Sequence, residues 1–132
     1  MAVADGAGLP LACGIASGER HETKLVLDTL KNRFLRALPK KMIGDKAYDS
    51  DALDAELAKR GIELIAPNLS TRAIQSQDRR KLRHRYRRRW LIERLFAWLM
   101  RCRRLVTRYE TKAEMFLGLL RLACARLLWK RL

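Results

Sequence analysis

Two carboxylates in this sequence stand where a metal ion could use them. Asp45 ends a short apolar segment, residues 41–45 (KMIGD), and Glu93 is a single acid in the arginine-rich stretch of residues 79–104. Carboxylate oxygens bind hard cations, and Mg²⁺ prefers one or two of them together with water and substrate phosphate. We therefore interpret Asp45 and Glu93 as partners in a candidate metal site.

Each of these acids also has a purely structural interpretation. Asp45 could cap the turn that follows its strand, because aspartate accepts local backbone hydrogen bonds. Glu93 could form an intrahelical ion pair with Arg89, four residues earlier, and such a pair contributes only about 0.3–0.5 kcal/mol when exposed. The local sequence leaves both alternatives open.

Tyr86, Arg89 and Glu93 follow one another at spacings of three and four residues. Such residues share one face of a helix. Arg89 could contact a phosphate through two hydrogen bonds, and Tyr86 could stack on a base or orient a phosphate. The competing interpretation makes Arg89 one more solvated arginine and Tyr86 an aromatic residue that touches the core.

The segment around Asp45 predicts a strand–helix–strand unit. After the strand of residues 41–45, Asp49 or Ser50 is a suitable N-cap for a helix that ends near Gly61. Residues 62–66 form the next expected strand. Such a unit favours a parallel pair in an α/β layer. Ligand sites of open α/β sheets lie beyond the carboxyl ends of the strands, which is where Asp45 falls.

The first residues predict a hairpin. Apolar residues flank Asp5-Gly6, and Asp-Gly between apolar runs is a strong hairpin signal, so residues 2–16 should form two strands. Turn chemistry explains Asp5 structurally. A helix is expected over residues 22–35, and its inward-facing side chains are expected to be Leu25, Val26, Leu30 and Phe34.

The second half of the chain predicts two helices. One is the basic helix of residues 79–104, followed by a break over residues 103–111. The other covers residues 112–132. Its expected apolar face consists of Phe116, Leu119, Leu120, Ala123, Leu127 and Leu128.

Charge is distributed unevenly along the 132 residues. Residues 1–66 contain 10 Lys and Arg against 10 Asp and Glu, whereas residues 67–132 contain 19 against 4. Such one-sided charge indicates a polyanionic partner, most often nucleic acid. An anionic membrane surface is the weaker reading, because the basic run has no clean apolar face before Leu91, and no transmembrane run is present.

The three cysteines indicate neither a zinc site nor a disulfide framework. Cys13, Cys102 and Cys124 are scattered and form no CxxC motif. No charged segment precedes an apolar run at the amino terminus, so no secretory signal is predicted. We expect a cytoplasmic protein with reduced thiols.

Three motifs together resemble a known family. The opening VADGAGLPL, then GDKAYDSDAL, then IERLFAWL with RRLVTRYE are similar, in this order along the chain, to segments of bacterial insertion-sequence transposases with a DDE, RNase H-like domain. The family's third-acid region reads Tyr, two residues, Arg, three residues, Glu, six residues, Lys. Tyr86, Arg89 and Glu93 match its first three positions.

The resemblance implies an incomplete RNase H-like α/β fold, with a small sheet of hairpin and parallel strands packed by helices and followed by long basic helices. It implies that Asp45 and Glu93 are the second and third catalytic acids and hold Mg²⁺ or Mn²⁺ in a two-metal site when the domain is complete. The implied partner is the double-stranded DNA of transposon terminal repeats, with a homo-oligomer as the complete assembly. The expected DNA-binding residues are Tyr86, Arg89, Arg79, Arg80, Lys81, Arg83, Arg85, Arg87 and Arg88.

The chain departs from the family pattern at two places. Met100 occupies the position of the family's Lys, so that phosphate contact is lost or passes to Arg101. The family's first catalytic Asp precedes the hairpin, and neither Asp5 nor Asp28 matches it. We therefore expect a partial catalytic domain over residues 1–132. Its parts are a sheet-containing region (1–66), a polar loop (67–77) and a basic helical region (78–132).

Two origins are compatible with such a partial domain: an upstream reading frame that supplies the missing strand and Asp, or a decayed gene. In either case we expect no DNA cleavage by the isolated chain. Two other functions compete with this interpretation. One is a non-catalytic basic DNA-binding protein that inhibits transposition, and the other is an RNA-binding protein.

Overall fold

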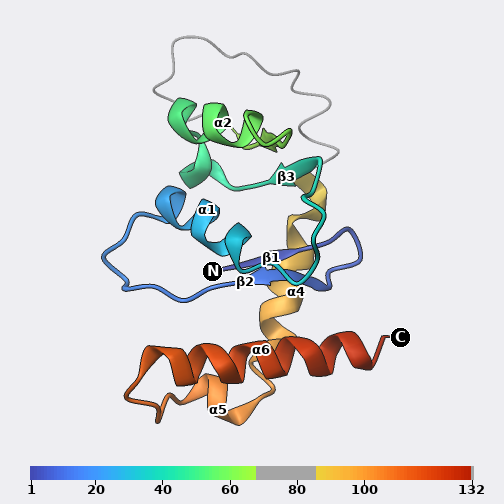
Figure 1. Cartoon of the computed structure of the whole chain (residues 1–132). Helices are drawn as coiled ribbons and strands as arrows, with labels where there is room; N and C mark the ends of the chain where they lie inside the picture. Colours follow the sequence, from blue (N-terminus) through green and yellow to red (C-terminus); the bar gives the residue numbers. More distant parts are fainter. Residues whose placement is uncertain (68–85, 132) are drawn as a thin grey trace.

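The computed structural model describes residues 1–67 and 86–131, which form short strands and helices in alternation (Figure 1). In the first part these are β1 (Ala2–Ala4), β2 (Pro10–Cys13), α1 (Glu22–Lys31), β3 (Lys41–Ile43), the 3₁₀ turn η1 (Lys46–Tyr48), α2 (Asp51–Ala58) and β4 (Glu63–Ile65). In the second part they are the 3₁₀ turn η2 (Arg87–Arg89), α4 (Trp90–Leu99), α5 (Arg103–Val106) and α6 (Ala113–Trp129). The predicted mixed α/β class is confirmed.

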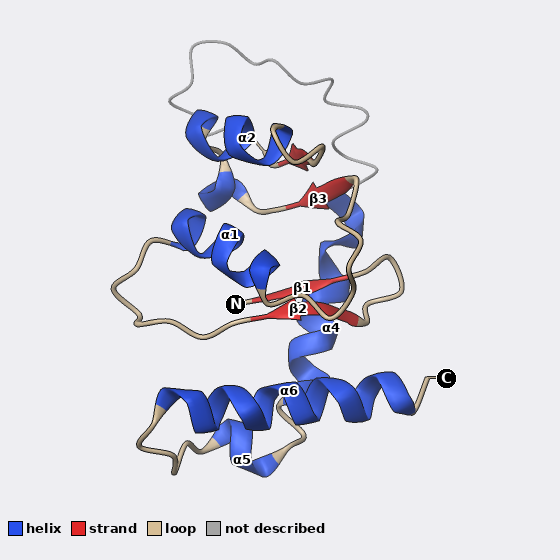
Figure 2. Cartoon of the chain, in the orientation of Figure 1, coloured by secondary structure: helices blue, strands red, loops and turns tan. Residues whose placement is uncertain are grey.

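The strands form two separate pairs. β1 and β2 are antiparallel, and β3 and β4 are parallel, as the hairpin and the strand–helix–strand pattern predicted. Within the described residues each sheet has two strands, and no strand joins one sheet to the other (Figure 2). We expected one small sheet from the sequence, whereas the described residues form two separate two-stranded sheets.

Helices pack on both faces of the β1–β2 hairpin, as the alternation of side chains along β1 shows. Val3 packs into the cluster formed with α1 and α2, whereas its neighbours Ala2 and Ala4 pack against the cluster formed with α4 and α6. Successive side chains of a strand point to opposite faces, so one short strand contributes to two hydrophobic cores. The first core contains Val26, Leu30, Leu53, Leu57 and Ile62, and the second contains Cys13, Leu95, Leu99, Ala123 and Cys124.

Helix α1 ends earlier than the sequence pattern predicts. The expected helix ran to Leu35, but Asn32 is the C-cap and donates its N–H to the carbonyl of Thr29. The chain then turns to pair with the outer edge of β2, where Arg33 bridges Ala12 and Phe34 donates to Leu11 at 2.8 Å. These strand-edge hydrogen bonds replace helical ones, and Phe34, expected to face inward, is exposed.

The basic helix also ends earlier than predicted. Residues 79–85 lie outside the described residues, the turn η2 covers Arg87–Arg89, and α4 ends at Leu99 instead of Arg104. After Leu99 the chain reverses so that Cys102 and Leu105 pack beside α6. Tertiary packing here overrides helix propensity, and α5 forms inside the stretch expected to be a break.

Helices α2 and α6 agree closely with the prediction. Ser50 caps α2 by accepting a hydrogen bond from the Leu53 N–H, as expected for one of the two proposed cap residues. Helix α6 begins after Lys112, and of its expected apolar face Ala123 is buried and Leu120 and Leu127 pack against the second core, together with Leu117 and the buried Cys124, which were not predicted. Helix α4 contains Glu93, and its packing against α6 fixes its orientation.

Candidate functional site

A cavity of about 770 Å³ lies between the two sheets, and we call it the central cavity. Strands β1 and β3 line it from the two sheets, and helices α1 and α4 line it from the two helical layers. Asp45 and Glu93, which are 48 residues apart in the sequence, both line it. The fold therefore brings the two candidate metal ligands to one space.

Asp45 lies at the carboxyl end of β3, as the sequence predicted. It is the N-cap of η1, and its Oδ1 accepts the N–H of Ala47 at 2.9 Å. Its neighbour Gly44 allows the tight turn: a Cβ there would lie 2.9 Å from the ring of Tyr48. Asp45 therefore caps this turn, as its structural interpretation predicted. The cap engages one of the two carboxylate oxygens, Oδ1.

Glu93 lies on the first turn of α4, in line with two residues of the preceding turn. Arg89 donates to the Tyr86 hydroxyl at 2.8 Å and lies 3.4 Å from Glu93 Oε1. The predicted common face of Tyr86, Arg89 and Glu93 is confirmed by these contacts. The Tyr86 hydroxyl raises the pKa of Arg89 above its ordinary value, so the guanidinium is a permanent cation at this edge of the cavity.

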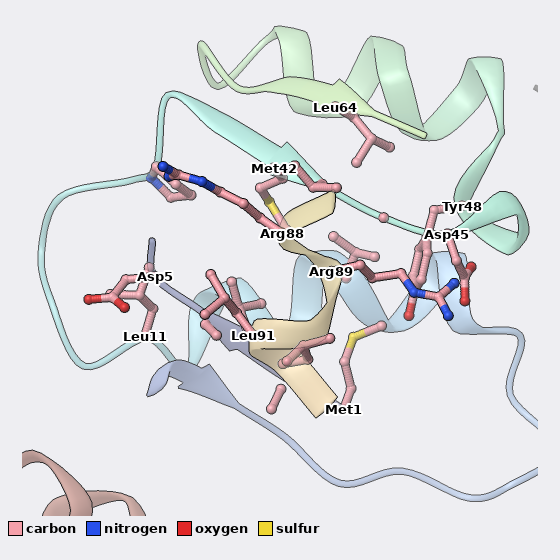
Figure 3. A pocket seen from close by; sticks show the side chains of 18 of the residues that line it. Met1, Asp5, Leu11, Met42, Asp45, Tyr48, Leu64, Arg88, Arg89 and Leu91 are labelled. Atoms are coloured by element: carbon pink, nitrogen blue, oxygen red, sulfur yellow. The ribbon is translucent and has the colours of Figure 1, made fainter. Parts of the chain in front are cut away.

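The polar groups gather at two opposite ends of the central cavity. Asp45, Tyr48 and Arg89 lie together at one end, and Arg89 extends toward Asp45 (Figure 3). Arg88 extends toward the other end, where Asp5 lies (Figure 3). The Arg89 side chain thus contacts Glu93 on α4 and extends from there toward Asp45.

Asp5 is explained by its turn, as the sequence predicted. Its Oδ1 accepts the backbone N–H groups of Ala7 and Leu9, each at 2.8 Å. It lies across the cavity from Asp45 (Figure 3). Asp5 therefore holds the β1–β2 hairpin and does not join the Asp45 end.

Tyr48 is a cavity residue that the sequence analysis did not single out. Burial raises the pKa of its hydroxyl, and the nearby carboxylates of Glu22 and Asp45 raise it further. Tyr48 therefore stays neutral and can donate a hydrogen bond at any physiological pH. Tyr48 is the last residue of η1, the turn that Asp45 caps, and this position was the only sequence signal for it.

Arg94 is a second residue that the sequence analysis missed. Its guanidinium lies between the rings of Trp90 and Trp98, at 4.6 and 4.7 Å from their centroids, and donates to the carbonyl of Ala7. Gly8, with φ of +80°, lies so close that a Cβ would be 2.6 Å from Arg94 Nη2. Arg94 thereby clamps the hairpin onto α4, the helix that contains Glu93. The spacing of the two tryptophans, four residues on either side of Arg94, was the available signal.

Asp45 and Glu93 have the oxygen chemistry that a divalent cation prefers, and both line one cavity. Within residues 1–67 and 86–131, no three His, Cys, Asp or Glu side chains form a metal-binding cluster. Asp45 and Glu93 supply hard oxygen ligands at a shared, solvent-open cavity, and Mg²⁺ binds readily through one or two carboxylates. A complete two-metal site needs further ligands beyond these two.

The basic residues proposed for DNA binding are described only in part. Arg87, Arg88 and Arg89 form η2 and are exposed next to the cavity. Arg79, Arg80, Lys81, Arg83 and Arg85 lie outside the described residues. No helix among the described residues is long and apolar enough to cross a membrane.

Comparison with known proteins identifies the family. The family described as "Transposase DDE domain" matches residues 1–128, and the chain belongs to it. A relative in Burkholderia cepacia, named as a transposase for insertion sequence element IS402, is 29% identical over 138 residues. The alignment covers 98% of this chain and 62% of the relative, so the chain spans less than two thirds of that protein. No solved structure matches the chain. The resemblance to insertion-sequence DDE transposases is thereby confirmed.

Proposed function

We propose that this chain is part of an insertion-sequence transposase and contributes two acids to metal-dependent cleavage and transfer of DNA strands. The observation that carries this proposal is the common position of Asp45 and Glu93 on the wall of one cavity. Membership of the transposase family supports it, and so does the basic η2 turn beside the cavity. Its place of action would be DNA in the cytoplasm.

The two two-stranded sheets and the helices that pack on them support an RNase H-like fold for the complete domain. In that fold Asp45 would be the second acid and Glu93 the third. They would hold Mg²⁺ or Mn²⁺, which supplies charge stabilisation and an activated oxygen nucleophile in phosphoryl transfer. The chain's own part is positioning: β3 and η1 fix Asp45, and the Arg94 clamp fixes the helix that presents Glu93.

Arg89 and Tyr86 would bind the DNA backbone at the same edge. Arg89 is exposed and can exchange its contact with Glu93 for a phosphate, because both side chains remain open to solvent. Its hydrogen bond to Tyr86 limits the conformations of the guanidinium before DNA arrives. Met100, which replaces the family's Lys, is 56% exposed and cannot hold a phosphate.

We also propose that the isolated chain does not cleave DNA. Of the carboxylates that line the cavity, we assign only Asp45 and Glu93 to the metal, and two ions need more shared ligands than these. Nicking of a terminal-repeat duplex by the purified chain in Mg²⁺ or Mn²⁺ would contradict this proposal.

The catalytic assignment is tested in a reconstituted domain that cleaves DNA. Asp45→Ala and Glu93→Ala should each abolish cleavage while DNA binding is retained. Asp5→Ala is a matched control, because its carboxylate holds a turn at the other end of the cavity. Unchanged cleavage in the Asp45 or Glu93 variant would refute the assignment.

A second candidate is a non-catalytic DNA-binding protein that competes with a complete transposase. The exposed arginines of η2 and the excess of basic residues after residue 66 favour it. Its binding should weaken steeply with salt, and removing Arg87 and Arg88 together should lower the slope of log K against log salt by about 2. Strong preference for structured RNA over duplex DNA would instead favour an RNA-binding protein.

A further inference from the structure

We propose that the exposed face of α6 is a docking surface for an amphipathic helix of a partner protein, a helix whose apolar stripe is flanked by acidic residues. This surface is separate from the central cavity, so the inference goes beyond the proposed function. It is carried by the spacing and exposure of the side chains on this face of α6 and by the charges beside them.

Three large apolar side chains of α6 lie in solvent, although the helix packs on a core with its other side. Met115, Leu122 and Trp129 are 63%, 67% and 80% exposed. A single exposed apolar residue is ordinary on a protein surface. Several that gather on one face of one helix form a patch, and such patches mark interaction sites.

The spacing of these three residues places them in one line. They follow one another at intervals of seven, which return to nearly the same side of a helix, so they form a stripe along the 17 residues of α6. Gly118 and Ala125, both exposed, lie between them on the same side. We call these five residues the α6 seam. Their pattern is that of the a and d positions of a coiled coil, which form the contact between two helices.

The small residues of the seam leave room for a second helix. A Cβ on Gly118 would have no heavy atom within 4 Å, so no contact in the described part of the chain requires glycine there. Glycine is one of the least favourable residues in a helix interior. Large residues that alternate with small ones offer knobs and holes into which the side chains of another helix fit.

The opposite side of α6 is already occupied. Leu120, Ala123, Cys124 and Leu127 pack in the second core, which also contains residues of α4 and β2. Helix α6 lies at the other end of α4 from β3 and α2 (Figure 1). A helix docked on the seam would therefore leave the central cavity open.

Charge selects among the possible occupants of the seam. Residues 112–131 contain one acid, Glu114, and five basic residues, Lys112, Arg121, Arg126, Lys130 and Arg131. Two copies of α6 would bring like charges together, which disfavours a second copy of this chain. Acidic residues on both sides of the apolar stripe of a partner helix would complement these charges.

Nucleic acid suits the seam poorly. A duplex presents phosphates along its surface but no apolar stripe that could cover Met115 and Leu122. A helix with apolar and acidic residues satisfies both features of this face, its exposed apolar line and its basic flanks. The seam is therefore distinct from the basic turn η2, which lies beside the cavity.

The test uses a fluorescent three-heptad peptide with leucine at its a and d positions and glutamate at its e and g positions. It is titrated with the 132-residue chain, and fluorescence anisotropy measures binding. A second peptide with lysine in place of every glutamate is the charge control. We expect the glutamate peptide to bind at least tenfold more tightly than the lysine peptide.

Variants localise the binding. Leu122→Glu places a charge in the middle of the seam and should weaken the glutamate peptide at least tenfold. Leu35→Glu makes the same change in charge at a leucine that is 59% exposed and lies outside α6. It should leave the affinity within about twofold of the original, because it does not touch the seam. Circular dichroism checks that both variants keep their helices.

Two results would overturn the proposal directly, namely equal binding of the two peptides and equal effects of the two variants. A dimer of the chain in sedimentation that Leu122→Glu dissociates would overturn it as well, because a second copy would then occupy the seam. None of these measurements involves DNA or metal. Failure here therefore differs from failure of the catalytic assignment, which the Asp45 and Glu93 variants decide.

Discussion

The guanidinium of Arg89 lies 3.4 Å from the carboxylate of Glu93, one helical turn further along the wall of the central cavity. The same side chain extends toward Asp45 at the end of β3 (Figure 3). A positive charge therefore already stands between the two acids. The Arg89 and Glu93 side chains are 45% and 64% exposed, so their ion pair is weak, and the proposed metal ion would have to displace only this weak contact.

The first prediction concerns Tyr48 and alkaline pH. Burial and nearby carboxylates raise the pKa of Tyr48 in the folded protein above its unfolded value of about 10. The folded state therefore favours the neutral phenol. The resulting stability is fully present below pH about 10 and is lost as pH rises through the folded pKa. Thermal unfolding between pH 9 and 11.5 should show this decline.

Tyr48→Phe should flatten that alkaline decline, because phenylalanine has no hydroxyl to ionise. Tyr109→Phe is the control, since Tyr109 is 71% exposed and should leave the pH profile unchanged. A Tyr48→Phe profile as steep as that of the original chain would show that other groups cause the decline.

The second prediction concerns the core beneath Glu93. Leu95 of α4 is fully buried against β2 and α6. Leu95→Ala should therefore lower the free energy of unfolding by about 2–5 kcal/mol. Leu122→Ala on the exposed side of α6 should change it by less than about 0.5 kcal/mol. Urea unfolding measures both. Equal effects of the two substitutions would contradict the packing of α4 against the hairpin.

The third prediction concerns the Arg94 clamp. Arg94→Ala removes two ring contacts and a hydrogen bond to Ala7, and should cost roughly 2 kcal/mol of stability. Tryptophan fluorescence should also change, because the guanidinium lies against Trp90 and Trp98. Arg126→Ala, at an exposed position of α6, is the matched control. Lysine at position 94 should recover little, because it lacks the planar group that stacks on both rings.

The sequence predicted the elements whose causes are local. Asp-Gly in the hairpin, Ser50 before α2 and the apolar periodicity of α6 each express a preference of nearby residues, and the structure contains all three. The position of Asp45 after β3 follows from the same local reasoning.

The sequence did not predict features that depend on distant contacts. Helix α1 stops where Arg33 and Phe34 pair with β2, and α4 stops where Cys102 and Leu105 pack with α6. The Arg94 clamp needs a hairpin 87 residues away in the sequence. The local sequence pattern also left Asp45 and Glu93 each with a structural alternative. Only the family resemblance led us to expect both acids at one site.

The central claim is that Asp45 and Glu93 bind the same metal ion, and a double-mutant cycle on Mn²⁺ binding tests it most directly. Calorimetry measures Mn²⁺ binding to Asp45→Asn, Glu93→Gln and the double variant. Asp5→Asn is the control. If the two carboxylates hold one ion, each single substitution should weaken binding nearly as much as both together, and Asp5→Asn should change nothing. Independent, additive losses at Asp45 and Glu93, or binding unchanged by either substitution, would contradict a shared metal site.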